Sequence, residues 1–131
     1  MPSVLIEIKN KYSYEHELAL IDAVHIALQE EFKILPTTIN VRLLVHEPHR
    51  FVCPPNKINP ELYTHITIDC LAGRTLDAKR KLYRKIVEKL ETLGIPKDHV
   101  KILLREINLE NCGIRGGQAG CDVELGFKIE V

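Results

Sequence analysis

The stretch Met1-Pro2-Ser3-Val4-Leu5-Ile6-Glu7-Ile8 opens the chain and decides how the rest of it is expected to fold. Val4, Ile6 and Ile8 alternate with other residues, which is the period of a β-strand with one well-buried face. Pro2 stands just before this strand, where a proline costs no ladder hydrogen bond. Its simplest role is therefore to begin a strand, but if Met1 is removed it also supplies a free secondary amine.

The chemistry of that amine depends on residue 1. A free amino terminus has a pKa of about 7.7 to 8, so a modest downward shift gives it substantial base character at neutral pH. If Met1 stays, the nitrogen of Pro2 is a tertiary amide and cannot act as a base. Pro2 is thus a candidate general base only in the processed chain.

The composition fits a single domain over residues 1–131. With 131 residues and 45% hydrophobic content, one core is expected to bury roughly two-thirds of the unfolded surface. Lysine plus arginine equals aspartate plus glutamate, at 18 each, so we expect neither nucleic acid nor a membrane surface as a partner. The sequence has no apolar run of about 18 residues and no signal-peptide core, which predicts a cytoplasmic protein.

The cysteines and histidines do not form a metal-binding pattern. The four cysteines are Cys53, Cys70, Cys112 and Cys121. None belongs to a Cys-x-x-Cys pair, and no histidine lies at zinc-finger spacing beside them, so we expect reduced thiols and no metal. His46, His49 and His65 are spaced irregularly across a loop, which favours a solvated segment. Cys112 and Cys121 flank a glycine-rich turn, and this leaves a disulfide between them open.

A first βαβ unit is predicted at about residues 2–46. Apolar residues recur at a spacing of three or four between Ser13 and Phe32, which predicts an amphipathic helix with Ser13 as its N-cap. After Pro36 the sequence becomes rich in β-branched and aliphatic residues, so residues 39–45 are expected to form the second strand.

A second βαβ unit at about residues 64–107 repeats this order. Residues 65–71 predict a strand, Thr75 is the expected N-cap of the next helix, and residues 100–107 predict another strand. The helix-end cluster Lys33-Ile34-Leu35-Pro36 is echoed by Leu93-Gly94-Ile95-Pro96. The chain therefore contains an internal repeat.

Two tandem βαβ units predict an α+β fold with a four-stranded sheet and both helices on one face. Residues 46–60 are rich in proline and asparagine and are expected to form a long connector. In the tail, residues 108–131, the turn at 113–117 and the alternation over 122–131 predict a β-hairpin and a terminal strand. A sheet face without helices must be covered, so we expect an oligomer.

At four places, in the right order, the chain resembles the tautomerase superfamily. Pro2 matches the terminal proline of that family, and Thr38-Ile39-Asn40-Val41-Arg42-Leu43 resembles the strand that carries an arginine in 4-oxalocrotonate tautomerase. Ala72-Gly73-Arg74-Thr75 resembles the family's Gly-Arg-Ser/Thr turn. Residues 106–117 resemble its glycine-rich hairpin. The resemblance covers essentially the whole chain and implies the tautomerase β-α-β fold, a fused two-unit chain, a homotrimer and a reaction that needs no cofactor.

The two halves have lost different parts of the family pattern. Thr64 stands where the second half would have its proline, and Tyr12 stands where the first half would have the turn arginine. Arg42 is kept in the first half, whereas the repeat carries Lys101. One complete site per chain is therefore expected from Pro2 and Arg42 of the first half together with Arg74 of the second.

The resemblance implies a keto-enol tautomerase, an isomerase acting on a small 2-oxo acid or its enol. Pro2 would be the general base, while Arg42 and Arg74 would bind the substrate carboxylate and stabilise the enolate oxygen, in either assignment. Nearby cations also disfavour the protonated amine. Phe51 would line the apolar side of the pocket. Considered on its own, each arginine would be expected to form a surface ion pair, and Phe51 would be expected to be a core residue.

Two other functions stay open at this point. The helix segment around His25 resembles malonate semialdehyde decarboxylases, but Ile39 stands at that branch's aspartate and Ala72 at its additional arginine. A decarboxylase or hydratase of a small 3-oxo acid is therefore an alternative. A hydratase or dehalogenase would need a carboxylate to activate water, and Glu47 and Glu106, which follow strands, are expected to be solvated or structural. The order of elements also fits a non-catalytic, ferredoxin-like ligand-binding module.

Overall fold

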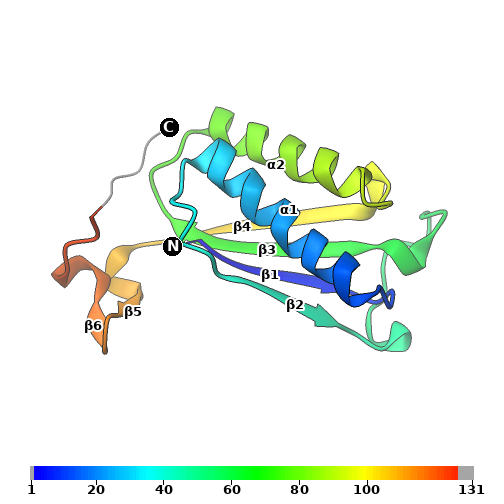
Figure 1. Ribbon diagram of the computed structural model, residues 1–131, viewed down its shortest axis with the longest axis horizontal. Helices are drawn as coiled ribbons and strands as arrows, with labels where there is room; N and C mark the ends of the chain where they lie inside the picture. Colours follow the sequence, from blue (N-terminus) through cyan, green and yellow to red (C-terminus); the bar gives the residue numbers. More distant parts are fainter. Residues whose placement is uncertain (1, 127–131) are drawn as a thin grey trace.

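The computed structural model describes residues 2–126. Its main elements are β1 (Ser3–Ile8), α1 (Tyr14–Phe32), β2 (Val41–Val45), β3 (Thr64–Leu71), α2 (Leu76–Glu91), β4 (Val100–Ile107), β5 (Gly113–Ile114) and β6 (Gln118–Ala119). Strands β1 to β4 form one sheet in the order β2-β1-β3-β4, and β5 pairs with β6 (Figure 1). The predicted α+β fold with two βαβ units is confirmed.

The pairing directions tell how the two units join. β1 runs parallel to β2, and β3 runs parallel to β4, as expected within a βαβ unit. β1 and β3 are antiparallel. The start of each unit's first strand therefore lies beside the end of the other's, and β1 and β3 occupy the centre of the sheet.

Both predicted helix caps are present. The Ser13 side chain accepts a hydrogen bond from the backbone N–H of His16 at 3.1 Å, and the Thr75 side chain accepts one from Ala78 at 3.1 Å. Each satisfies an N–H group that the first turn of the helix leaves unpaired. α1 ends where Lys33 turns into the left-handed region, at φ 55°.

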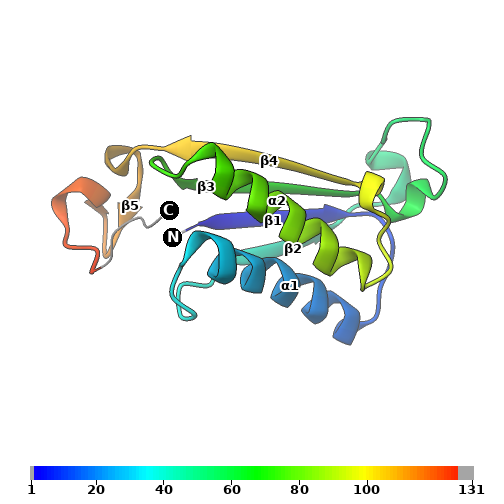
Figure 2. The same ribbon diagram turned by 90° about the horizontal axis from the view of Figure 1, so that it is seen from above.

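The core lies between the helices and one face of the sheet, and both helices cover that same face (Figure 2). Val4, Ile6 and Ile8 of β1 point into it and are at most 1% exposed. The other residues of this cluster are also apolar: Leu20, Val24, Ala27, Leu28, Phe32, Ile66, Ile68, Cys70, Ala78, Leu82, Ile86, Leu90 and Ile95. In β1, therefore, Val4, Ile6 and Ile8 face the core, and the residues between them face the open side of the sheet.

The second face of the sheet is open in the single chain. It carries the alternate residues of each strand, including Leu44 at 46% and Leu103 at 45% exposure. Large apolar side chains exposed on a sheet face that no helix covers are typical of surfaces that associate. Among residues 2–126, no helix is long and apolar enough to cross a bilayer.

The tail differs in part from its prediction. The β5–β6 hairpin confirms the expected turn, but Gly120–Asp122 form a single 3-10 turn and residues 123–126 contain no strand. The remainder of the predicted terminal strand, residues 127–131, lies outside the described residues. Cys112 and Cys121 are not joined by a disulfide, and Cys53 and Cys70 are not either.

Candidate active site

The sheet register places Pro2 beside Cys70. Pro2 is buried and directly precedes β1. Because Ser3 pairs with Asp69 in the antiparallel ladder, the residue before Ser3 falls next to the residue after Asp69. The end of β3, the turn after it and the start of α2 therefore meet the amino terminus at one end of the sheet (Figure 1).

Arg42 reaches the same end from β2. It pairs with Leu5 in the parallel ladder and lies exposed on the open face of the sheet. Its Nη2 atom donates a hydrogen bond to the hydroxyl of Ser3 at 3.4 Å. The guanidinium of Arg42 is thus held next to the residue that follows Pro2.

Arg74 approaches from the turn between β3 and α2. Its Nη1 donates to the carbonyl of Leu71 at 3.5 Å, and its Nη2 donates to the carbonyl of Phe32 at 3.4 Å. The guanidinium lies 4.4 Å from the centroid of the Phe32 ring. Within residues 2–126 the buried Nε of Arg74 has no hydrogen-bond partner. The hydrogen bonds to Leu71 and Phe32 thus use only two of the five N–H groups of the guanidinium.

Burial and the Cys70 side chain set the electrostatic surroundings of Arg74. Burial lowers the pKa of the Arg74 guanidinium, and the neighbouring Cys70 side chain opposes that change. Burial also raises the pKa of the Cys70 thiol, although Arg74 acts against this. At neutral pH the thiol is therefore protonated, and it contacts Arg74 without neutralising it.

Arg105, at the same end of the sheet, is an arginine whose charge is neutralised by a carboxylate. Its Nε and Nη2 donate to the two carboxylate oxygens of Asp69 at 2.7 and 2.9 Å, a bidentate pair. Within the part of the chain that the structure describes, neither Arg42 nor Arg74 has a carboxylate within 4.0 Å. These two arginines can therefore receive an anionic ligand.

Phe51 lies elsewhere in the single chain. The backbone carbonyl of Phe51 accepts a hydrogen bond from Lys9 Nζ at 2.9 Å, and its ring packs edge-on against His46 and Tyr63. Lys9 follows β1 and Tyr63 precedes β3, so Phe51 is at the opposite end of the sheet from Pro2. Within one chain Pro2, Arg42 and Arg74 thus lie toward the same end of the sheet, with Arg42 on the open face and Arg74 beside the helices, whereas Phe51 lies at the other end.

The positions that correspond to the site in the repeat lie at that opposite end and carry other chemistry. Thr64 is fully buried, and its hydroxyl donates to the carbonyl of Leu62 at 3.0 Å. The ring of Tyr12 stacks on His16, and burial raises its pKa. Lys101 is exposed on the open face. These residues do not reproduce the proline and arginine set of the first end.

Other side chains singled out in the sequence have structural partners. His25 is buried, and its Nε2 donates to the carbonyl of Pro36 at 3.1 Å. His46 pairs with Glu7 at 2.9 Å, and Glu106 pairs with Lys79 at 3.1 Å. Among the described residues, no group of three or more potential metal ligands occurs.

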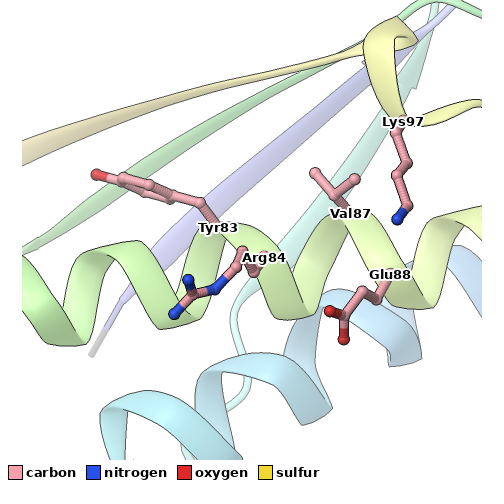
Figure 3. Close-up of a pocket in the computed structure, with 5 residues that line it drawn as sticks. All are labelled: Tyr83, Arg84, Val87, Glu88 and Lys97. Atoms are coloured by element: carbon pink, nitrogen blue, oxygen red, sulfur yellow. The ribbon is translucent and has the colours of Figure 1, made fainter.

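A separate shallow pocket of about 290 Å³ lies along α2 (Figure 3). It is lined by Tyr83, Arg84, Val87, Glu88 and Lys97. Burial raises the pKa of the Tyr83 phenol. None of the predicted site residues lines this pocket, so it is distinct from the Pro2 end of the sheet.

Sequence reasoning missed Phe32, Cys70 and Ser3 as neighbours of the site. The antiparallel pairing of β1 and β3 places Cys70 next to Pro2. Ser3 contacts Arg42, and Cys70 contacts Arg74. Phe32 was recognised only as a core position. No local pattern signals that the last turn of α1 supports an arginine about forty residues away.

Comparison with known proteins gives the family. A family model described as "Tautomerase enzyme" matches residues 38–115, which is more than half of the chain. The chain belongs to this tautomerase family. Among curated proteins none matches the sequence significantly.

Solved structures share the fold along most of the chain. A malonate semialdehyde decarboxylase, FG41, inhibited by 3-bromopropiolate is 25% identical with a TM-score of 0.79, covering 89% of this chain and 92% of its own. Pt0534 inactivated by 2-oxo-3-pentynoate is 21% identical with a TM-score of 0.82, covering 92% and 97%. The R7 fused 4-OT, solved as an asymmetric trimer, is 17% identical with a TM-score of 0.81, covering 92% and 97%. These relatives include both tautomerase and decarboxylase branches.

Proposed function

We propose that this protein is a cofactor-independent keto-enol tautomerase that acts on a small 2-oxo acid or its enol. The observation that carries this proposal is that Arg42 and Arg74, which have no carboxylate partner among the described residues, both lie toward the end of the sheet where Pro2 stands, Arg42 on the open face and Arg74 beside α1. A carboxylate-bearing substrate would supply the missing negative charge. Membership in the tautomerase family supports a catalytic function for this protein.

The reaction would use Pro2 in its free secondary-amine form, after removal of Met1. The neutral nitrogen would accept the proton of the enol hydroxyl, and the resulting ammonium would return a proton to carbon, so the amine is regenerated. Arg74, which has no carboxylate partner among the described residues, would bind the substrate carboxylate. Arg42 would stabilise charge on the enol oxygen. Both cations would also favour the neutral amine.

The decarboxylase or hydratase alternative is supported by the similarity to malonate semialdehyde decarboxylase. A hydratase needs a carboxylate that can activate water. Two carboxylates near the Pro2 end are Asp69, which is engaged by Arg105, and Glu106, which is engaged by Lys79. Because both are ion-paired, we favour tautomerisation over hydration, and decarboxylation, which consumes no water, stays the second candidate.

A homotrimer is part of this proposal. The open sheet face with exposed Leu44 and Leu103 supports association, and fused 4-OT proteins of this fold were solved as trimers. Phe51 would then line the site from a neighbouring copy, since its position at the far end of the sheet does not serve Pro2 of the same chain.

The experiment that tests the proposal combines mass spectrometry with kinetics. The intact mass of protein from its own host should lack Met1, and the Pro2→Ala variant should lose about 10²- to 10⁴-fold in kcat for ketonisation of phenylenolpyruvate while keeping its melting temperature. Intact Met1 in the native protein would refute the proposal. Binding of the acid with no turnover by either protein would favour the non-catalytic binding module instead.

A further inference from the structure

Within the described part of the chain, the partners of Arg74 share one property: all are uncharged. The guanidinium contacts the carbonyl oxygens of Leu71 and Phe32, the face of the Phe32 ring and the Cys70 side chain. We call these three residues the Arg74 cradle. Each partner interacts favourably with a cation, the ring through its π face and the carbonyls as acceptors.

Phe32 gives the cradle a rigid base. Its side chain is 1% exposed and it is the last residue of α1. Arg74 therefore lies at a helix carboxyl terminus, where unpaired carbonyl groups favour a positive charge. Arg74 belongs to the second βαβ unit, but its guanidinium packs against Phe32 of the first unit.

Cys70 is the cradle residue that lies next to Pro2 in the sheet. Its side chain is 1% exposed and faces the core with Ile66 and Ile68. The ladder places Cys70 between Pro2 on one side and Glu106 on the other. Purely apolar packing would be served by isoleucine, as at the preceding core positions of β3, so the thiol adds a weak acceptor where Arg74 needs one.

Asp69 and Arg105 provide an internal comparison. Asp69 is the residue before Cys70, and its carboxylate holds Arg105 through two hydrogen bonds. A carboxylate in the cradle would occupy the Arg74 fork in the same way. The neutral cradle fixes the guanidinium in place, and among residues 2–126 no carboxylate occupies its fork.

We propose that Phe32 and Cys70 are positioning residues that hold Arg74 in a cradle of uncharged groups, so that its charge stays free for a substrate carboxylate. This inference rests on the proposed function for its kinetic readout. It assigns to the cradle a role in the affinity for acids, separate from the proton transfer at Pro2.

The test compares three substitutions at Cys70 in the full chain, with phenylenolpyruvate as the substrate. Cys70→Asp should raise KM at least 30-fold because the new carboxylate pairs with Arg74. Cys70→Ala should raise KM about 3- to 10-fold, with kcat changed less than twofold. Cys70→Ser keeps an acceptor and should stay within twofold of the wild type. Phe32→Leu, which removes the ring face, should behave like Cys70→Ala.

Matched controls separate positioning from loss of packing. Ile68→Val on β3 and Leu28→Val on α1 shorten fully buried side chains that are not partners of Arg74. They should lower the melting temperature and leave KM unchanged. If Cys70→Ala and Phe32→Leu change KM no more than these controls, or if Cys70→Asp is folded and binds substrate normally, the proposal is overturned.

A binding measurement distinguishes failure of this inference from failure of the proposed function. Phenylpyruvate should raise the melting temperature of the wild-type protein, and Cys70→Asp should abolish that rise. If the rise is present and sensitive to Cys70→Asp but no turnover occurs, the cradle stands and the tautomerase proposal fails. If turnover occurs and neither KM nor the rise responds to Cys70→Asp, the cradle proposal fails and the tautomerase proposal stands.

Discussion

Arg74 donates a hydrogen bond to the backbone carbonyl of Phe32 at 3.4 Å while its guanidinium lies 4.4 Å from the centre of the Phe32 ring. The two residues belong to different βαβ units. The contact therefore joins the second unit's arginine to the first unit's helix at the end of the sheet where Pro2 lies. Neither unit alone contains both the proline and a supported Arg74.

The first prediction concerns Arg74. Arg74→Ala should raise KM for an enol acid about 10- to 100-fold, because a hydrogen-bonded charge pair contributes about 1.5 to 3 kcal/mol. Arg74→Lys should fall between the wild type and Arg74→Ala, since it keeps the charge but loses the planar fork. Steady-state kinetics and thermal melting measure both effects. Unchanged kinetics with a lowered melting temperature would make Arg74 a purely structural residue.

The second prediction contrasts two arginines on the open face of the sheet. Among residues 2–126, Arg42 has the Ser3 hydroxyl as its hydrogen-bond partner, whereas Arg105 is paired with Asp69. Arg42→Ala should reduce kcat/KM by about 10²-fold, as expected for loss of a charge that stabilises the transition state. Arg105→Ala should stay within about threefold of the wild type, because its charge is already engaged. Equal losses in the two variants would contradict this assignment.

The third prediction uses the two helix caps as a matched pair. Ser13→Ala and Thr75→Ala should each lower the free energy of unfolding by about 1 kcal/mol, because each removes the acceptor of an N-terminal N–H group. Chemical denaturation measures this loss. Only Thr75→Ala should also raise KM, by a few-fold, because Thr75 adjoins Arg74. A KM effect in Ser13→Ala would point to a global cause.

The fourth prediction concerns acid stability near the start of β4. His99 is 2% exposed; its Nε2 accepts from the backbone N–H of Asn59 at 3.2 Å, and its Nδ1 donates to Asp98 at 2.7 Å. This hydrogen bond lowers the pKa of Asp98 below its ordinary value of 3.8. A lowered folded-state pKa stabilises the protein above the unfolded-state pKa and loses that effect as pH falls through the folded-state pKa.

The melting temperature of the wild type should therefore fall more steeply between about pH 4.5 and pH 2.5 than that of Asp98→Asn. Asp22→Asn, which alters an exposed carboxylate of α1, serves as the control and should run parallel to the wild type. Parallel curves for wild type and Asp98→Asn would show that the hydrogen bond between Asp98 and His99 does not contribute to stability.

Local patterns predicted most of the fold. The alternation in β1, the helix caps at Ser13 and Thr75, and the apolar run that became β4 all act over a few residues, so the sequence displays them directly. β4 occupies the predicted residues 100–107. The start of β2 shifted from residue 39 to Val41, where the ladder with Val4 begins.

The surroundings of the site were harder to predict, because they depend on which strands pair and in which direction. Hydrophobic period does not specify that β1 and β3 are antiparallel, and only this pairing brings Cys70 beside Pro2. The position of Phe51 depends on the path of the connector at residues 46–60, whose contacts with Lys9 and Tyr63 are tertiary. The contact between Arg74 and Phe32 is also a tertiary contact, between residues far apart in the sequence.

The antiparallel contact between β1 and β3 also bears on how such a duplicated chain can evolve. The second unit has Thr64, an internal residue, where a proline amine of its own would stand. It nevertheless carries Arg74 at the end of the sheet where Pro2 lies. A substitution in either unit can therefore alter the surroundings of the same proline, so the two units would be constrained together.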